Sequence, residues 1–207
     1  LAVGPDKVAA FIAEPIQGAG GVIIPPATYW PEIQRIVDKY GILLISDDVI
    51  CAFGRLGSWF GYEKFGFKPD LVTFAKAVTS GYIPLGGVMV GNRVAKVLID
   101  KGGEFNHGYT YSGHPVACAV GLANIGVMER EGLVEGVKGE LGIYFAKRYA
   151  ELNEHPLVGV AESCGLMAGL VLVKNKKTKE RFKAEDAVGM LCRSFCFNNG
   201  LIMRAVG

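Results

Sequence analysis

Short apolar runs separated by helical patterns are the feature that most limits the folds open to this chain. The runs occupy residues 8–13, 42–45, 71–74 and 88–90. Runs of this length without polar alternation are typical of strands buried on both faces, as in parallel sheets covered by helices. Apolar residues recur at helical spacing over 29–40, and a further helix is expected over 92–101. The pattern predicts an α/β fold with a mainly parallel sheet covered by helices.

The second part of the chain has a different pattern of expected helices and strands. We expect helices over 114–131 and 133–154, then two strands over 157–162 and 166–173 joined by a tight turn at Cys164-Gly165. A helix over 184–199 and a strand starting at 201–204 follow. We place a domain boundary near residues 131–135. It divides 1–132, part of a large domain, from 133–207, part of a small α+β C-terminal domain.

Composition excludes several classes of protein. Half of the residues are hydrophobic and 20% are charged, so the chain as a whole is not disordered. A net charge of +2 gives no reason to expect a nucleic acid or an anionic membrane as partner. The longest charge-free stretch, residues 105–128, begins with a polar turn, so it does not form a membrane-spanning helix. The basic run at 174–183 is interpreted as a solvated loop.

The five cysteines are an odd number without a disulfide-like spacing, which favours a reducing compartment and a cytoplasmic protein. Cys192 and Cys196 lie one helical turn apart, but no histidine or further cysteine is nearby. We interpret them as buried thiols. The three histidines are far apart in the sequence, so we expect no metal site.

Lys76 and the pair Asp47-Asp48 are the first candidates for chemistry. Each follows an apolar run, and ligands of parallel sheets bind beyond the carboxyl ends of the strands. A desolvated lysine amine becomes nucleophilic, as Schiff-base chemistry requires. Adjacent carboxylates on an extended chain point to opposite faces, so only one of them faces a given ligand. Taken alone, the local sequence favours a solvent-exposed lysine and an ordinary Asp-Asp turn.

Glycine-rich loops and one hydroxyl-rich segment are possible phosphate sites. The loops at 18–21 and 86–87 lack the spacing of dinucleotide-binding and P-loop motifs, so dinucleotide and ATP binding are weakly supported. Residues 109–115 lead directly into an expected helix, whose N-terminus suits an anion, although an ordinary capped helix start explains them equally well.

Together these segments resemble the class III, fold-type I aminotransferases, which depend on pyridoxal 5'-phosphate (PLP). The similarity is closest to the ω-amine:pyruvate branch, which includes putrescine:pyruvate transaminases. The matching segments occur in the family's order and cover nearly the whole chain: Glu14-Pro15-Ile16-Gln17-Gly18, Leu44-Ile45-Ser46-Asp47-Asp48-Val49, Phe53-Gly54-Arg55, Lys68-Pro69-Asp70-Leu71, Phe74-Ala75-Lys76, Pro84-Leu85-Gly86-Gly87 and Thr110-Tyr111-Ser112-Gly113-His114-Pro115.

The resemblance implies a role for each of several residues. Lys76 would form the Schiff base with PLP and afterwards move a proton at the substrate. Asp47 would pair with the pyridine nitrogen, and Val49 would pack on the ring. Thr110 would bind the phosphate of the neighbouring subunit, which implies a homodimer with shared active sites. Arg204 would bind the carboxylate of the oxo acid.

Several residues of this chain differ from the family pattern, and these differences bear on the expected substrate and fold. Asp48 stands where Glu is usual, and Ala52 replaces a common Gly. Ala19 stands where GABA and ornithine members usually carry Glu, which favours the pyruvate branch. The family's N-terminal half and final strands are absent, so the fold would be an incomplete PLP-transferase large domain with part of the small domain. We expect this chain alone to be inactive.

The resulting functional hypothesis is an omega-transaminase that moves an amino group from a primary amine or ω-amino acid to pyruvate in ping-pong half-reactions. A PLP-dependent aminomutase and a transaminase that uses 2-oxoglutarate are alternatives with the same fold. A non-catalytic α/β fragment is the remaining alternative.

Overall fold

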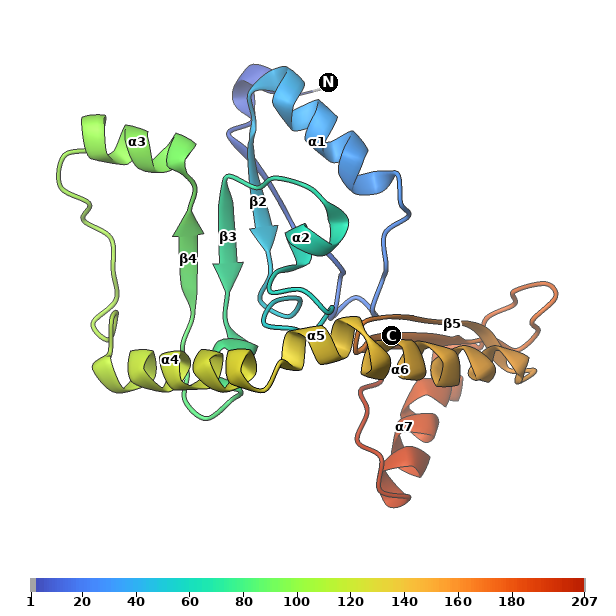
Figure 1. Ribbon diagram of the computed structural model, residues 1–207. Coiled ribbons are helices and arrows are strands. Elements are labelled where there is room, and N and C mark those ends of the chain that lie inside the picture. The colour runs from blue at the N-terminus through green and yellow to red at the C-terminus, as the bar shows by residue number, and fades with distance from the viewer. Residues whose placement is uncertain (1–2, 207) are drawn as a thin grey trace.

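The structure, a computed structural model, describes residues 3–206. Within them one sheet contains β1 (Ala10–Ala13), β2 (Leu43–Asp47), β3 (Leu71–Phe74) and β4 (Gly87–Val90), in this spatial order (Figure 1). β1, β2 and β3 are parallel, whereas β4 runs antiparallel to β3. The predicted strands and the mainly parallel sheet are confirmed, with one antiparallel strand at the edge.

Burial in the sheet is greatest in its centre. Leu44 and Ser46 of β2 have no exposed surface, because β1 and β3 flank this strand and α1 packs near it. The prediction that the strands are buried on both faces is wrong for the two outer strands. Ile12 of β1 and Val88 of β4 are more than half exposed, since each has a neighbouring strand on one side only within residues 3–206.

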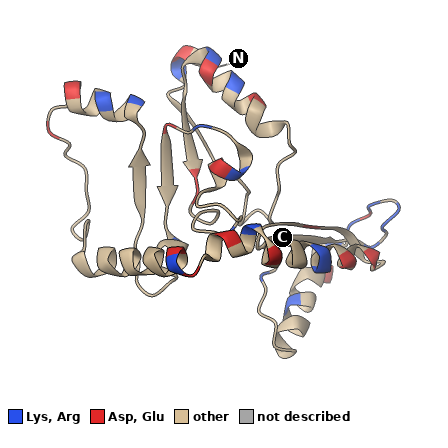
Figure 2. Cartoon of the chain, viewed as in Figure 1, with Lys and Arg blue, Asp and Glu red and all other residues tan. Residues whose placement is uncertain are grey.

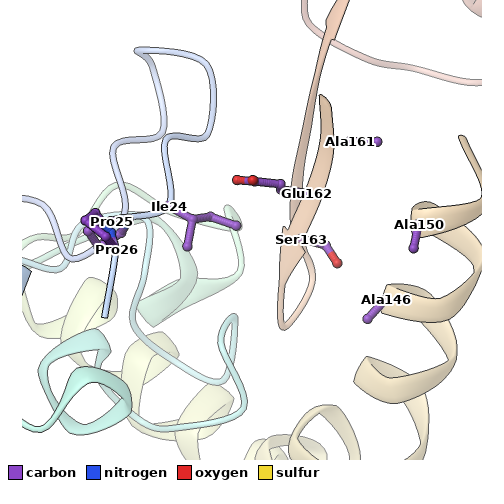
Figure 3. Close-up of a pocket in the computed structure, with 8 residues that line it drawn as sticks. All are labelled: Ile24, Pro25, Pro26, Ala146, Ala150, Ala161, Glu162 and Ser163. Atoms are coloured by element: carbon purple, nitrogen blue, oxygen red, sulfur yellow. The ribbon is translucent and has the colours of Figure 1, made fainter. Parts of the chain in front are cut away.

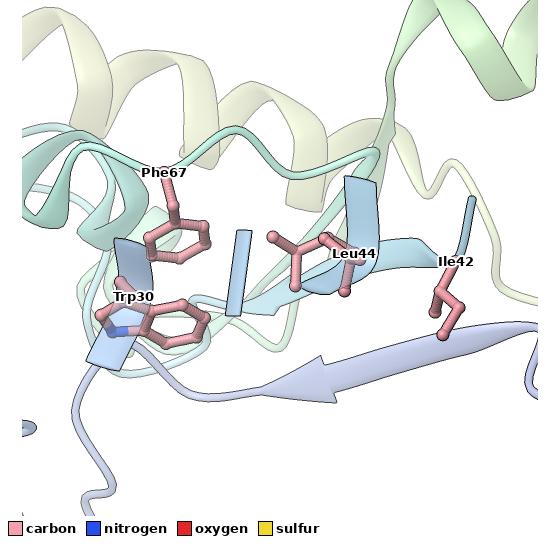
Figure 4. Packing of buried hydrophobic residues seen from close by; sticks show 5 residues of the cluster. Trp30, Ile42, Leu44 and Phe67 are labelled. Atoms are coloured by element: carbon pink, nitrogen blue, oxygen red, sulfur yellow. The ribbon is translucent and has the colours of Figure 1, made fainter. Parts of the chain in front are cut away.

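The helix α1 (Tyr29–Tyr40) has the predicted bounds. It ends at Gly41, whose φ of 68° is a left-handed conformation that favours glycine. Trp30 at its start stacks on Phe67, with ring centroids 3.8 Å apart and planes 10° from parallel (Figure 4). Its indole N–H donates to the carbonyl oxygen of Pro15 at 3.2 Å, so the ring is both packed and hydrogen-bonded.

The short 3-10 helix η2 (Lys76–Thr79) follows β3 and is held by α4 (Pro115–Arg130). The Asn124 side chain of α4 donates to the carbonyl oxygens of Ala77 and Val78 at 2.9 and 3.1 Å. Figure 1 shows α4 crossing at the end of the sheet where β3 leads into η2. Val116 and Leu122 of α4 are exposed, so this helix is packed on part of its surface only.

Other short helices connect these elements. They are η1 (Pro5–Lys7), α2 (Gly61–Phe65) and α3 (Asn92–Lys101), and α3 has the predicted bounds. No helix within residues 3–206 is long and apolar enough to span a bilayer.

The predicted helix over 133–154 is wrong as a single element. The chain instead forms α5 (Leu133–Lys138), α6 (Glu140–Ala150) and the 3-10 helix η3 (Glu151–Glu154). Gly139 between the first two has φ −96° and ψ −119°, which is outside the helical region. Glycine tolerates this conformation easily and has a weak helical preference, so the break falls at one of the three glycines of the segment, which are Gly136, Gly139 and Gly142.

The two predicted strands of the second part are confirmed as an antiparallel hairpin. β5 (Val158–Cys164) pairs with β6 (Met167–Leu172), and Gly165 in the turn has φ 56°. A Cβ at Gly165 would lie 2.5 Å from the carbonyl oxygen of Arg55, so this turn packs tightly against the first part of the chain. The basic run at 174–183 is an exposed loop beside this hairpin (Figure 2).

Two predictions for the end of the chain are wrong. The helix α7 (Val188–Asn198) starts later than residue 184, because Ala187 has φ 44° and separates it from the 3-10 helix η4 (Ala184–Asp186). Residues 201–206 form no strand. A strand needs a partner for its backbone groups, and no described segment pairs with this one.

The Trp30 contacts predict a measurable order of stability. We expect Trp30→Ala to lower the free energy of unfolding of the intact protein by about 3–5 kcal/mol, because a large buried ring is removed. Trp30→Phe should lower it by about 1–3 kcal/mol, because the ring remains while the Pro15 carbonyl loses its donor. Tyr40→Ala, at the exposed end of the same helix, is the control, with an expected loss below about 1 kcal/mol. Urea unfolding measures all three, and equal losses would contradict this account of the core.

Candidate active site

The carboxyl ends of β2 and β3 bring the main candidate residues to one edge of the sheet. β2 ends at Asp47, which pairs in register with Thr73 of β3, and Lys76 follows the end of β3 by two residues. Because the two strands are parallel, their carboxyl ends emerge at the same edge. The placement of Asp47 and Lys76 beyond adjacent strand ends therefore agrees with the prediction. Figure 2 shows acidic colour at this end of β2.

Asp47 is held in place through one carboxylate oxygen. Its Oδ1 accepts hydrogen bonds from the Thr73 hydroxyl at 3.1 Å and from the Val49 backbone N–H at 3.3 Å. Its Oδ2 has no hydrogen-bond partner within residues 3–206, and the residue is partly exposed. The arrangement fixes the side chain and leaves one acceptor oxygen available to a cationic N–H donor.

Lys76 is exposed and has an unusual backbone. Its φ of 45° lies in the left-handed region, which is uncommon for residues other than glycine. Such conformations cluster at functional sites, where the surrounding structure maintains them. Here the support comes from η2, which Asn124 holds through two hydrogen bonds. This chain does not bury the lysine, so residues 3–206 do not supply the desolvation considered from the sequence.

Thr73 and Asn124 are supporting residues that the sequence analysis missed. Thr73 lies 26 residues from Asp47, and Asn124 lies 46 residues from the carbonyl group of Val78. A threonine in a strand and an asparagine in a helix carry no local motif. Only the strand register and the packing of α4 on η2 reveal their contacts.

Asp48 is buried, unlike its neighbour Asp47. Its side chain has no exposed surface and lies within hydrogen-bond distance of the Ser46 hydroxyl, at 2.6 Å. It also accepts from the backbone N–H of Gly61. Burial raises the pKa of Asp48, and the hydrogen bonds from Ser46, Gly61 and Tyr62 oppose that rise only in part. The two carboxyl groups therefore occupy different environments, as expected for adjacent residues of an extended chain.

Thr110 lies in an exposed loop that precedes α4. This loop lines a pocket of about 400 Å³ with Tyr109, Tyr111 and His114, opposite Pro84 and Leu85. The Ser112 hydroxyl oxygen accepts a hydrogen bond from the Tyr109 N–H at 2.8 Å and holds the loop's turn. No hydrogen bond connects Thr110 with Asp47 or Lys76 among the described residues. Within one chain, the structure does not bring Thr110 to those two residues.

Val49 and Arg204 are the other residues named from the sequence. Val49 is partly buried two residues beyond Asp47 and donates its backbone N–H to the Asp47 carboxylate. Arg204 is exposed in the segment after α7 and makes no ion pair within residues 3–206. Of the five candidates, the structure brings Asp47 and Val49 into contact, places Lys76 at the same edge, and leaves Thr110 and Arg204 apart.

The larger pocket lies away from these residues. Its volume is about 610 Å³, and it lies between the loop at 24–26 and the α6–β5 region, with Glu162 and Ser163 as its polar side chains (Figure 3). It contains neither a lysine nor a paired carboxylate. The candidate chemistry therefore depends on the strand ends and not on this cavity.

The cysteines show no arrangement suited to catalysis. Cys51 is buried, its Sγ donates to the Ile16 carbonyl oxygen, and burial raises the pKa of its thiol to about 12. Burial also raises the pKa of Cys192 and Cys164. All five cysteines are free. Within residues 3–206, no three His, Cys, Asp or Glu side chains lie close enough together to hold a metal ion.

Comparison with known proteins gives consistent matches over the whole chain. The sequence profile described as aminotransferase class-III matches residues 1–204. The putrescine–pyruvate aminotransferase of Pseudomonas aeruginosa is 61% identical over 207 residues, which are 100% of this chain and 45% of that protein. The diaminobutyrate–2-oxoglutarate transaminase of Halomonas elongata is 47% identical over 210 residues, again 100% of this chain and 45% of that protein.

Solved structures match equally well. A thermostable (S)-enantioselective omega-transaminase from Thermomicrobium roseum superposes with a TM-score of 0.94 at 46% identity, covering 99% of this chain and 46% of that one. An amine transaminase from an uncultivated Pseudomonas species, described in its PLP-bound (internal aldimine) form, gives 0.93 at 38% identity, covering 100% and 47%. These neighbours confirm the PLP-transferase fold. The chain spans about 45% of the length of the curated relatives named above. It belongs to the class-III aminotransferase family.

Proposed function

We propose that the protein is a PLP-dependent transaminase that moves an amino group from a primary amine or ω-amino acid to pyruvate in ping-pong half-reactions. The observation that carries the proposal is the strand-end arrangement. Asp47, fixed through one oxygen, and Lys76, in a left-handed backbone conformation, lie beyond adjacent parallel strands in a class-III aminotransferase chain.

The residues at the strand ends fit the chemical groups of PLP. The cofactor carries a pyridine nitrogen, an aldehyde and a phosphate. The available Oδ2 of Asp47 suits the protonated nitrogen, because a carboxylate is a strong acceptor for a cationic N–H. The exposed amine of Lys76 suits the aldehyde. Two of the three groups therefore find partners in this chain, and Thr110 is the candidate partner for the phosphate.

When bound, PLP supplies an aldehyde that accepts the amino group and a ring that withdraws electrons. The remaining work belongs to residues of the protein. Asp47 holds the proton on the ring nitrogen, and the Thr73 hydroxyl keeps the Asp47 carboxylate oriented. Val49 would pack against the ring face. The Lys76 amine would take the proton from the substrate Cα and deliver it to the C4′ carbon of the cofactor.

The active site is shared between two subunits in this proposal. Thr110 is exposed and is not hydrogen-bonded to Asp47 or Lys76 of its own chain among the described residues. It would reach the phosphate site of a neighbouring subunit, so the protein would be a homodimer. The division into a large part, 1–132, and a small part, 133–207, and the cytoplasmic location remain predictions.

Pyruvate is the proposed acceptor. A putrescine–pyruvate aminotransferase is 61% identical to this chain, whereas a 2-oxoglutarate transaminase is 47% identical. Ala19 also supports pyruvate, because the sequence resemblance associates a glutamate at this position with GABA and ornithine transaminases. Arg204 is proposed to bind the oxo-acid carboxylate. An acceptor screen of the intact protein separates pyruvate from 2-oxoglutarate, and an amino group retained within the substrate would indicate an aminomutase.

Replacement of Lys76 tests the attachment site. Lys76→Ala in the intact protein should abolish turnover, while Asp47 and the phosphate contacts can still hold PLP without a covalent bond. Borohydride treatment followed by peptide mapping should find the pyridoxyl group on Lys76 of the parent and on no residue of the variant. Lys76→Arg, which keeps the positive charge, should be equally inactive. A pyridoxyl label on another lysine would refute the assignment.

Replacement of Asp47 tests the ring-nitrogen partner. Asp47→Asn should lower PLP affinity by about 1.5–3 kcal/mol, because a charge-assisted hydrogen bond becomes a neutral one. The loss in kcat should exceed this, since an amide cannot hold the ring nitrogen protonated. Thr73→Val is the matched variant, because it removes one hydrogen bond to Asp47 and keeps the charge, so its effect should be smaller. Single-turnover kinetics measure both effects. A larger effect of Asp48→Asn would show that Asp48, and not Asp47, is the partner of the ring nitrogen.

Replacement of Arg204 tests the acceptor site. Its planar guanidinium binds a carboxylate in a bidentate way that lysine does not reproduce. Arg204→Ala should slow the half-reaction with pyruvate or alanine by on the order of 2–4 kcal/mol in kcat/KM and largely spare an amine without a carboxylate. Arg204→Lys should recover only part of the loss, and Arg193→Ala, an exposed arginine of α7, is the control. Equal losses in both half-reactions would assign Arg204 to the fold or the cofactor.

A further inference from the structure

Asp48 connects three elements at the end of β2. Its backbone N–H donates to the Thr73 carbonyl oxygen of β3 at 3.0 Å. Its carboxyl group contacts the Ser46 hydroxyl of β2 and accepts from the backbone N–H of Gly61, the first residue of α2. One residue therefore connects β2, β3 and α2 next to the carboxylate assigned to the cofactor.

The contact between Asp48 and Gly61 leaves no free space. A Cβ added to Gly61 would lie 2.7 Å from the Asp48 Oδ1 and 2.6 Å from Cγ of Pro15. These separations are below the van der Waals contact of any side chain. The first turn of α2 therefore approaches Asp48 through bare backbone, and any larger residue at position 61 would displace the carboxyl group or Pro15.

Asp48 is held by hydrogen bonds and not by a cation. Its side chain is fully buried, and no Lys, Arg or His forms an ion pair with it within residues 3–206. A buried carboxyl group in this setting depends on hydrogen-bond donors. Its two oxygens accept from the Ser46 hydroxyl and from the backbone N–H of Gly61, so the two donors hold the side chain in one orientation.

We propose that Asp48 is a positioning residue that fixes the direction of the Asp47 carboxylate through its contacts with Ser46, Gly61 and Thr73. The proposal rests on the proposed function of Asp47. Asp48 anchors the backbone turn in which the Val49 N–H donates to Asp47, so displacement of Asp48 would move both neighbours.

Three titratable groups face Asp48 from the elements around it. They are Asp47 of β2, Cys51 of the following loop and Tyr62 of α2. Burial raises the pKa of the Cys51 thiol to about 12 and raises the pKa of the Tyr62 hydroxyl above its usual value, so both stay neutral near pH 7. The nearby Asp47 carboxylate adds to the rise in the pKa of Asp48.

The pH dependence of stability tests the burial of Asp48 without any cofactor. The pKa of Asp48 is higher in the folded than in the unfolded protein, because burial disfavours the charged carboxylate. Between these two values the folded protein keeps a proton that the unfolded protein loses, so the free energy of unfolding falls as pH rises through that window. The Asp48→Asn variant lacks this fall. Its urea midpoint in the apo form, relative to that of the parent, should therefore rise as the pH increases from about 4, the ordinary pKa of an aspartate carboxyl group. A flat or falling difference would contradict the burial of the Asp48 carboxyl group and overturn the proposal.

Kinetics and spectra of the PLP-loaded intact protein test the positioning role. Asp48→Ala should lower kcat by about tenfold or more with little change in KM, and should shift the pH midpoint of the visible cofactor band. Asp48→Asn should restore both, since the amide has the same shape and can keep hydrogen bonds to Ser46 and Gly61. A purely structural role would change stability without moving the spectral midpoint.

Each remaining outcome is also decisive. Loss of kcat in Asp48→Asn equal to that in Asp48→Ala would show that the shape and hydrogen bonding of the side chain do not maintain the site, and would overturn the proposal. An unchanged kcat and spectral midpoint in Asp48→Ala would overturn it as well. If Asp48→Ala does not fold, Gly61→Ala takes its place, because its Cβ would displace the carboxyl group. Failure of the proposed function would appear as a missing label on Lys76, which leaves the apo stability result unaffected.

Discussion

Parallel pairing of β1, β2 and β3 is the constraint on which the rest of the structure depends. Parallel strands need a crossover connection, and each crossover returns the chain so that successive carboxyl ends emerge at one edge. The register that pairs Asp47 with Thr73 therefore determines which side chains meet. A shift by one residue would exchange Asp47 with Asp48 and place the exposed carboxylate in the core. The register of the sheet therefore determines where the candidate site residues lie.

The packing around Trp30 is connected to the end of β2 by a series of close contacts. Trp30 connects α1 to Phe67 by stacking and to Pro15 by a hydrogen bond, and Pro15 also borders Gly61. Gly61 in turn donates to Asp48 at the strand end. A continuous path of close contacts thus runs from the aromatic core to the edge of the sheet. Changes in the core are expected to reach the site through Pro15 and Gly61.

Much of this arrangement could be predicted from the sequence, because it depends on local pattern. The apolar runs located the strands, and the helical spacing of apolar residues located α1. The placement of Asp47 and Lys76 followed from the general behaviour of parallel sheets. Contacts across long separations could not be predicted in this way. Thr73 and Asn124 became visible only through register and helix packing.

The wrong predictions have physical causes of the same kind. Helical spacing continues through 133–154, but Gly139 permits a backbone conformation that ends the helix there. The apolar run at 201–203 resembles the start of a strand, yet a strand forms only where another segment offers its backbone groups. The burial expected for Val88 and Ile12 likewise depends on neighbours that residues 3–206 do not provide.

The left-handed backbone at Lys76 implies a conflict between two evolutionary pressures. An L-residue in this conformation is disfavoured by roughly 1–2 kcal/mol, and glycine relieves that strain. Selection for thermal stability alone would thus favour glycine at this position. Under the proposed function, selection for turnover would retain the amine. Attempts to raise thermal stability by relieving backbone strain would then need to leave position 76 unchanged, because glycine there would remove the proposed Schiff-base lysine.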